Sequence, residues 1–455
     1  MSENAFFLPV PAGTARRLAV GWLYLALYSL IGAGLVVILI LIARTPWLHT
    51  LLPWTGSFKT ALVIHVDLSV LVWFLAFAGF LASLNLADGG GRIGLVALGV
   101  AGVGAVLITF SPFLGVDAPY MNNYVPVLEN GAFFLGLLLF LTGSGVMAGY
   151  GLLAGRVSDG WSRGSGVLQF GLRSGLLILL ISLGSWIWSF VATPRVHEAV
   201  LYYEAVFWGG GHLLQFTHTQ LLVVVWLWLA SGAGGRVDLT PRVGALILLL
   251  GALPIVYAVW LHVQFRPGEP GFQIGFADLM KYGGGVAALP VGLAVVLSLR
   301  TAPADPALRP FRVALLLSVV LFGVGGVIGF LIQGVNVTIP SHYHGSIVAV
   351  TVAYMGLTYL LLPRLGFRSV AGRLAVWQLF AYGGGSLLHV FGLAWSGMLG
   401  VQRKTAGAAQ GLETISKKLA MGLTGAGGLI AVLGGILFLV ICFRAIRRHR
   451  PEGQL

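Results

Sequence analysis

The sequence predicts an all-α polytopic membrane protein with twelve transmembrane helices, and three observations support this fold class. Hydrophobic residues make up 58% of the 455-residue chain and charged residues only 9%, whereas soluble proteins carry about 25% charged residues. Apolar runs of about 20 residues, the length that crosses the hydrocarbon core of a bilayer, recur along the chain. Short polar or Gly/Pro-rich linkers separate these runs.

The runs define the spans in chain order, within a single transmembrane domain that covers residues 1–455. The start, MSENAFFLPVPAGTARR, lacks the pattern of a cleavable signal peptide, so we expect the first span to be retained. The last span contains Cys442, the single cysteine, so the sequence offers no disulfide framework, CxxC metal knuckle or CxxCH haem-attachment site. The predicted spans are residues 17–43, 59–86, 92–110, 128–154, 171–191, 205–231, 241–263, 283–300, 311–334, 343–363, 374–400 and 420–445.

The formal net charge of +13 comes from Lys and Arg residues that lie mostly in the linkers. Linker cations orient membrane helices, so this charge does not indicate a nucleic-acid partner. With twelve spans, 18 of the basic residues fall on one side of the membrane and 9 on the other. The positive-inside rule then places both termini in the cytoplasm. We expect a bacterial or archaeal cytoplasmic membrane protein surrounded by lipid.

Seven of the ten histidines lie in or at the edge of predicted spans, where polar side chains are costly and mark functional candidates. Six of them belong to five different spans and share one layer in the outer half of the membrane. Scattered structural histidines have no reason to share a depth, so the layer predicts a buried ligand cluster. These six are His65, His212, His262, His342, His344 and His389.

The stretch TIPSHYHGSI places His342 and His344 two residues apart at the start of the tenth span. Residues i and i+2 of a helix point about 200° apart. We therefore expect the two imidazoles to face opposite sides and to bind different groups. Imidazole is a common ligand of Fe, Cu and Zn. With one cysteine and few intramembrane carboxylates, haem fits better than iron–sulfur or calcium sites.

This pattern resembles subunit I of the haem–copper oxidase superfamily, with the C-type oxidases and the nitric oxide reductases as the nearest branch. The resemblance covers essentially the whole chain. It implies two haems: a low-spin haem held by His65 and His344, and a high-spin haem held by His342 alone.

The stretch HVFGLAWSGMLGVQRKTAG, which begins at His389, is similar to the end of helix eleven in that family. There a histidine is followed by a basic pair that holds the haem propionates. The resemblance assigns this role to Arg403 and Lys404, and makes His389 a further cofactor-binding residue. The assignment is physically sound because buried carboxylates need cationic, hydrogen-bonding partners.

The non-haem metal site departs from the family pattern. His212, in FWGGGHLLQFTHTQ, matches the ligand on the sixth helix, but YAVWLHVQF offers only His262 where the family has two adjacent histidines. Gln264 or a water would complete the ligand set, and non-haem iron accepts mixed N/O ligands more readily than copper does. The metal therefore stays open between copper and iron.

A redox tyrosine is also displaced. Many oxygen reductases carry it four residues past the sixth-helix histidine, where this chain has Phe216. The C-type enzymes carry it on helix seven, near the position of Tyr257. Tyr257 and Gln264 are therefore the predicted catalytic residues. His218, about 240° around the helix from His212, is either a proton-relay group or a core histidine.

The resemblance implies a respiratory terminal reductase that reduces O₂, with nitric oxide as the alternative substrate. The electron donor would be a small cytochrome c, a cupredoxin-type subunit or quinol. Two further alternatives stay open: a dihaem electron-transfer or gas-sensing protein that lacks a working non-haem metal, and a transporter with a histidine-lined path.

Overall fold

The computed structural model describes most of the chain, namely residues 5–48, 57–87, 91–115, 118–157, 160–195, 198–370 and 372–447. In these ranges, twelve helical segments are long and apolar enough to cross a membrane. The predicted fold class, an all-α membrane protein with twelve spans, is confirmed. The observed segments are Gly13–Arg44, Phe58–Leu84, Arg92–Phe113, Gly131–Ala154, Gly164–Ala192, Ala199–Gly232, Pro241–Gln264, Pro270–Thr301, Pro306–Phe330, Thr338–Leu361, Arg373–Met398 and Ile415–Arg447.

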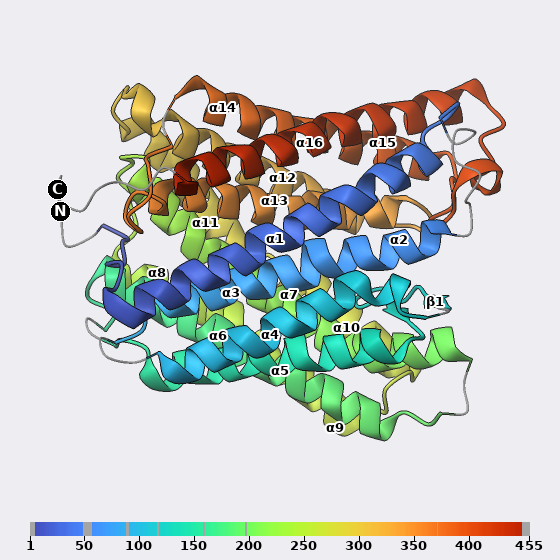
Figure 1. The fold of residues 1–455 in the computed structure, drawn as a ribbon, viewed down its shortest axis with the longest axis horizontal. Coiled ribbons are helices and arrows are strands. Elements are labelled where there is room, and N and C mark those ends of the chain that lie inside the picture. The colour runs from blue at the N-terminus through green and yellow to red at the C-terminus, as the bar shows by residue number, and fades with distance from the viewer. Residues whose placement is uncertain are drawn as a thin grey trace. The chain divides into compact units, whose positions relative to one another are not determined.

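The helical elements follow the same order, and several spans consist of two or three elements (Figure 1). The only strands in the described ranges, β1 (Pro119–Tyr120) and β2 (Val127–Leu128), form a small antiparallel hairpin between α4 and α5. The α-helices are α1 (Gly13–Arg44), α2 (Ser57–Val66), α3 (Trp73–Leu84), α4 (Arg92–Phe110), α5 (Gly131–Ala154), α6 (Gly164–Ala192), α7 (Ala199–Gly232), α8 (Pro241–Ala252), α9 (Pro254–Gln264), α10 (Pro270–Gly283), α11 (Ala288–Ser298), α12 (Arg309–Phe330), α13 (Thr338–Leu361), α14 (Arg373–Leu379), α15 (Gly385–Met398) and α16 (Ile415–Arg447).

Two observed boundaries differ from the sequence prediction in ways that matter for the site. The eighth span begins at Pro270 rather than at residue 283, because the polar stretch PGFQIGFADLMKYG forms α10 before the apolar run of α11. The tenth span begins at Thr338 rather than at residue 343. His342 and His344 therefore lie inside the first two turns of α13, where regular helical geometry fixes their directions.

Local sequence explains where several helices begin. The side chain of Asn130 accepts hydrogen bonds from the backbone N–H groups of Ala132 and Phe133 and caps α5. Thr240 caps α8 in the same way, and Pro241 occupies the first helical position, where no backbone N–H is needed. Pro254 separates α8 from α9 within the seventh span, as expected for a residue that cannot continue the backbone ladder.

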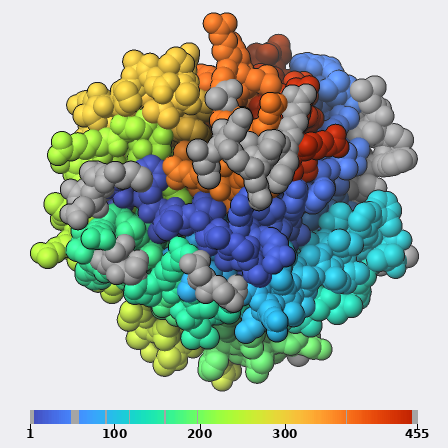
Figure 2. Space-filling view, turned by 60° about the vertical axis from the view of Figure 1, so that its left-hand side comes forward, coloured from blue at the N-terminus to red at the C-terminus, as the bar shows by residue number. Residues whose placement is uncertain are grey.

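The chain forms two compact units. The first comprises Met1–Leu30, Val66–Ser231 and Arg236–Leu297, and the second comprises Ile31–His65, Gly232–Gly235 and Ser298–Leu455. In the first unit the start of α1 packs on α4: the Leu18 side chain fills the space beside Gly94. In Figure 2 the dark-blue start of the chain accordingly lies beside the light-blue α4 segment.

In the second unit, α12 packs on α13 and α15 packs on α16, the latter pair seen side by side in Figure 1. A side-chain carbon at Gly325 of α12 would lie 2.6 Å from the backbone nitrogen of Ser346 on α13. Only glycine permits this approach, and small residues at helix crossings are the usual way in which membrane helices pack closely.

Two short π-helical segments interrupt spans that carry histidines. Asp67–Val72 begins two residues after His65, and Phe380–Gly384 ends five residues before His389. A π-segment changes the direction of the side chains that follow or precede it, and such segments are frequent at functional sites.

Candidate functional site

Three imidazoles gather in the second unit, contributed by α2, α13 and α15. The ring centroids of His344 and His389 lie 4.9 Å apart, with an interplanar angle of 53°. His65 interacts electrostatically with both rings. The structure thus brings together three of the six histidines that the sequence singles out, all within one unit.

Each of these rings is oriented by a backbone carbonyl. The Nδ1–H group of His344 donates to Pro340 O at 2.7 Å, that of His389 to Thr424 O at 2.8 Å, and that of His65 to Ala33 O at 3.2 Å. A carbonyl can only accept, so the proton lies on Nδ1 and Nε2 is the candidate ligand atom. Metal-binding histidines are usually oriented in this way by their second nitrogen.

His342 and His344 diverge, as the helical spacing predicts. The ring of His342 lies against α12: its Nδ1–H donates to Gly325 O at 2.7 Å, and a side-chain carbon at Gly329 would lie 2.6 Å from that nitrogen. His344 instead faces His389 of α15. The HxH pair therefore presents one imidazole to each of two neighbouring helices.

A buried cation lies beside this cluster. In the described part of the chain, neither Nε nor Nη2 of Arg44 has a hydrogen-bond partner, although both atoms are buried. Arg44 interacts electrostatically with His344, with His389 and with Tyr343, and Arg403 also interacts with Tyr343. Buried guanidinium nitrogens without an acceptor are costly. The site therefore fits an anionic ligand such as a haem with its carboxylates.

The basic pair predicted from the sequence lies in a turn after α15. Lys404 adopts a left-handed backbone conformation, with φ of 58°, in this turn. A non-glycine residue in this region of φ/ψ space is uncommon and often marks a tight turn. Arg403 contributes to the environment of Tyr343, next to the HxH histidines.

The first unit holds the other two candidate ligands. His212 of α7 is 4% exposed, and its Nδ1–H donates to Trp208 O at 2.8 Å. This bond lays the ring back over the preceding turn, where it contacts Trp208 at 4.7 Å and Phe276 at 5.7 Å between centroids. The ring is held by packing on two sides.

His262 of α9 has both nitrogens engaged. Its Nδ1–H donates to Ala258 O at 2.8 Å, and its Nε2 lies 2.7 Å from the hydroxyl oxygen of Ser185 on α6. Its ring also contacts Phe276, at 5.3 Å between centroids. His212 and His262 therefore pack against the same phenylalanine. In the described ranges, no three side chains from His, Cys, Asp and Glu are grouped as a metal site.

The triple glycine before His212 makes this packing possible. Side-chain carbons at Gly209, Gly210 and Gly211 would each collide with a different element. The nearest atoms would belong to Phe272 of α10, at 2.8 Å, to Trp186 of α6, at 2.4 Å, and to Tyr124, at 2.1 Å. The GGG stretch of FWGGGH therefore lets three neighbouring side chains pack directly against the backbone of α7.

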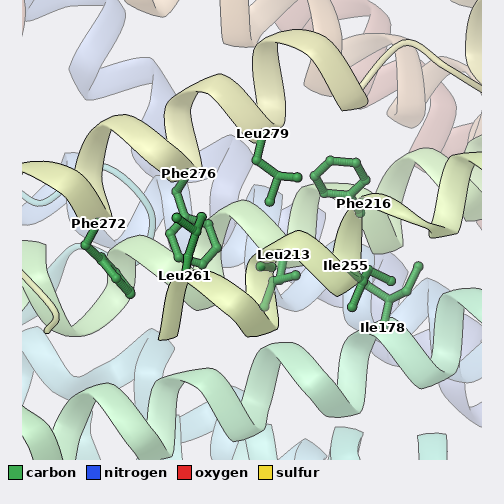
Figure 3. Packing of buried hydrophobic residues seen from close by; sticks show 9 residues of the cluster. Ile178, Leu213, Phe216, Ile255, Leu261, Phe272, Phe276 and Leu279 are labelled. Atoms are coloured by element: carbon green, nitrogen blue, oxygen red, sulfur yellow. The ribbon is translucent and has the colours of Figure 1, made fainter. Parts of the chain in front are cut away.

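The predicted catalytic residues lie elsewhere on α9. Tyr257 is 42% exposed and stacks on Trp260 at 5.3 Å between centroids. Gln264 is the exposed last residue of α9. No described contact joins either residue to His212 or His262, and their catalytic roles stay predictions. Phe216 is buried in a hydrophobic cluster with Ile255, Leu261, Phe276 and others (Figure 3).

Sequence reasoning missed two residues next to the histidines of this unit: Ser185 and Tyr124. Tyr124 lies in the loop between β1 and β2, and its ring is 4.8 Å from that of His212. The next residue back, Asn123, donates to both carboxylate oxygens of Glu204 on α7, at 3.0 and 2.5 Å. Burial, together with the negative charge of Glu204, raises the pKa of Tyr124 well above its ordinary value. No periodicity marks a loop residue, so Tyr124 cannot be found from a sequence pattern.

His218 is placed away from these contacts. It is 7% exposed and packs edge-on against Phe74 at 4.7 Å. Neither of its ring nitrogens has a hydrogen-bond partner among the described residues. The structure does not join it to His212, which agrees with their separation around α7.

Comparison with solved structures shows which known fold this chain shares. A heme-copper terminal oxidase, solved as a dimer, superposes on 97% of this chain and 85% of its own with a TM-score of 0.73, at 13% sequence identity. The chain therefore has the fold of a heme-copper terminal oxidase, as the resemblance in its sequence implies.

Curated sequences then place it more narrowly. The uncharacterized protein RP382 of Rickettsia prowazekii is 31% identical over 94% of this chain and 95% of its own length; this chain belongs to the same family as RP382. An uncharacterized protein of Aquifex aeolicus is 28% identical over 77% of this chain and 86% of its own. Cytochrome c oxidase subunit 1 of Thermus thermophilus is 25% identical over 98% of this chain and 86% of its own. No family model matches the chain.

Proposed function

We propose that this chain is the haem-binding catalytic subunit of a respiratory terminal reductase, an oxidoreductase whose substrate is O₂. The observation that carries the proposal is the cluster of His65, His344 and His389 beside Arg44, whose buried Nε and Nη2 have no hydrogen-bond partner among the described residues. The fold of a heme-copper terminal oxidase and the likeness to a cytochrome c oxidase subunit 1 support it.

In this proposal His65 and His344 hold the low-spin haem, and His342 holds the high-spin haem. The carbonyls of Ala33, Pro340 and Gly325 orient the three rings through their Nδ1–H groups. This orientation fixes which nitrogen can ligate iron and raises its basicity. When bound, the haems supply electron transfer and the reductive activation of a diatomic ligand.

The cations of the second unit hold the haem carboxylates. Arg44 supplies two buried donors that have no protein acceptor among the described residues, and Arg403 and Lys404 supply further positive charge from the turn after α15. Charge-assisted hydrogen bonds of this kind are shorter and stronger than neutral ones. They anchor the edge of the haem and set the electrostatic environment of its iron.

His212 and His262 hold the second metal, copper or non-haem iron, in the first unit. His389 packs on His344 and positions it. Electrons would come from a cytochrome c-type subunit, a cupredoxin-type subunit or quinol. The chain is an integral membrane protein; we place it in a bacterial or archaeal cytoplasmic membrane, with both termini cytoplasmic.

Spectroscopy of the purified protein tests the proposal. We expect two haems per chain in a pyridine haemochrome assay, one of which shifts its absorbance on binding CO after reduction, together with O₂ consumption when a chemical reductant supplies electrons. A protein without haem would overturn the proposal and favour the transporter. Two haems without O₂ or NO turnover would favour an electron-transfer or gas-sensing role.

Nitric oxide is the second candidate substrate, favoured by the ligand chemistry around His262. Only one imidazole comes from α9, and its nearest polar neighbour is the oxygen of Ser185. A mixed nitrogen and oxygen set suits non-haem iron better than copper. Comparing the rates of O₂ and NO consumption by the same preparation decides between the two substrates.

A further inference from the structure

The hydroxyl of Ser185 lies where a metal ligand is missing from the sequence pattern. Ser185, on α6, is 6% exposed, and its oxygen lies 2.7 Å from Nε2 of His262. Because Nδ1 of His262 carries the proton that it donates to Ala258 O, Nε2 is a lone-pair donor and the hydroxyl hydrogen points at it. Two donor atoms with lone pairs thus lie next to each other in a buried place.

Both atoms pack closely against a glycine of α7. A side-chain carbon at Gly209 would lie 3.2 Å from Nε2 of His262 and 3.2 Å from the oxygen of Ser185. The ring of Phe272 would lie closer still, at 2.8 Å, so only glycine lets α7 approach the two donor atoms this closely. One nitrogen donor and one oxygen donor therefore lie side by side against α7.

His212 lies on the same helix as this glycine. It follows Gly209 by three residues on α7, and positions i and i+3 are neighbours on a helix surface. The hydrogen bond from its Nδ1 to Trp208 O turns the ring back toward Gly209. His212 and His262 also contact Phe276 in common, at 5.7 and 5.3 Å.

We propose that Ser185 is the third protein ligand of the metal site, in a set of two imidazole nitrogens and one hydroxyl oxygen from His212, His262 and Ser185. This inference rests on the proposed function and specifies its second metal. Binding replaces the Ser185–His262 hydrogen bond: Nε2 and the hydroxyl oxygen both turn a lone pair to the ion, and the hydroxyl keeps its proton.

The distance between the donor atoms and their chemical types indicate which metal ion the site would bind. First-row metals bind nitrogen and oxygen at roughly 2.0–2.2 Å. Two donors 2.7 Å apart can both reach such an ion with small side-chain rotations. The set contains no thiolate or thioether, which Cu(I) prefers, and includes a hard oxygen, so it fits Fe²⁺ better than Cu(I).

Metal binding to a matched set of variants tests the inference. The wild type, Ser185→Ala, Ser185→Cys and Ser182→Ala are purified with their haems, stripped of loosely bound metal, and titrated anaerobically with Fe²⁺ alone and with Cu⁺ alone. Ser182 is the control, because it lies one turn earlier on α6, is fully buried, and donates its hydroxyl to the backbone oxygen of Gly210.

We expect Ser185→Ala to weaken Fe²⁺ binding by at least about tenfold, while Ser182→Ala binds it like the wild type. Ser185→Cys is expected to shift the preference toward Cu⁺, because a thiolate is a soft ligand. Unchanged or tighter Fe²⁺ binding by Ser185→Ala would overturn the inference, and so would a haem-containing wild type that binds neither ion. The haem spectrum of each variant reports folding, and absence of haem from the wild type would instead refute the proposed function.

Discussion

The histidine cluster of the second unit and the histidine pair of the first unit differ in the groups that surround their imidazole rings. In the cluster, backbone carbonyls orient every ring, and a buried arginine has donors without an acceptor. In the pair, backbone carbonyls also accept from each Nδ1, but aromatic rings pack on His212 and a serine hydroxyl occupies the second nitrogen of His262. We propose on this basis that the cluster binds a large anionic cofactor and that the pair binds a single metal ion.

Substitution of His342 is expected to have the largest effect, in comparison with substitution of a buried histidine outside both sites. His342→Ala removes the proposed single ligand of the high-spin haem, so we expect complete loss of the CO-binding spectrum while the other haem remains. His218→Ala is the control, since His218 has no hydrogen-bond partner among the described residues and contacts Phe74. Equal CO binding by the two variants would remove His342 from the haem site.

Arg44 tests whether the cluster is built for an anion. Arg44→Met removes the buried donors, and hydrogen bonds to charged groups contribute about 1.5–3 kcal/mol. We therefore expect haem to dissociate at least about tenfold more readily, measured by transfer to apomyoglobin. Arg173→Met is the control in the first unit, because Nη1 of Arg173 is also buried without a partner in the described ranges. If both variants retain haem equally, Arg44 does not bind it.

Gly211 tests how tightly the pair is packed. A methyl group at this position would lie 2.1 Å from the ring of Tyr124, and overpacking of this kind costs typically 1–3 kcal/mol. We expect Gly211→Ala to lower the midpoint of thermal unfolding and to weaken metal binding at His212. Gly184→Ala on α6 is the control, since its added carbon meets no atom within 4 Å. Identical unfolding midpoints for the two variants would show that the loop carrying Tyr124 moves aside without a cost in stability.

Tyr124 gives the smallest effect, a pH dependence in the alkaline range. The pKa of its phenol is raised in the folded protein by burial and by Glu204. Because the pKa of the phenol is higher in the folded than in the unfolded protein, its full contribution to the free energy of unfolding is present below the unfolded-state pKa of about 10. That contribution is lost as the pH rises through the folded-state pKa. We expect stability to fall more steeply above pH 10 in the wild type than in Tyr124→Phe, measured by chemical denaturation. Parallel curves would show that the phenol is not buried.

The sequence contained most of the fold and of the cluster, because both depend on regular spacing. Twelve apolar runs predict twelve spans, and the 200° separation of His342 and His344 predicts that their rings diverge. The start of the eighth span was misplaced because α10 carries Asp278 and Lys281, and hydropathy alone does not mark an amphipathic helix.

The pair was harder to predict, since its contacts join residues that no local pattern connects. Ser185 is 77 residues from His262, and Tyr124 reaches α7 from a loop. The GGG stretch was visible in the sequence, but its role in close packing follows only from the side chains of Phe272, Trp186 and Tyr124 that contact it. Tyr257 and Gln264 are exposed because of the way α9 is oriented in the fold, and a single sequence does not reveal this orientation.

Low-temperature electron paramagnetic resonance of the oxidised protein shows whether His65 and His344 hold a low-spin haem. We expect a low-spin ferric signal typical of two imidazole ligands. The signal should be present in the wild type and in His342→Ala and absent from His344→Ala. A low-spin signal that survives in His344→Ala, or a wild type that gives no haem signal, would contradict it.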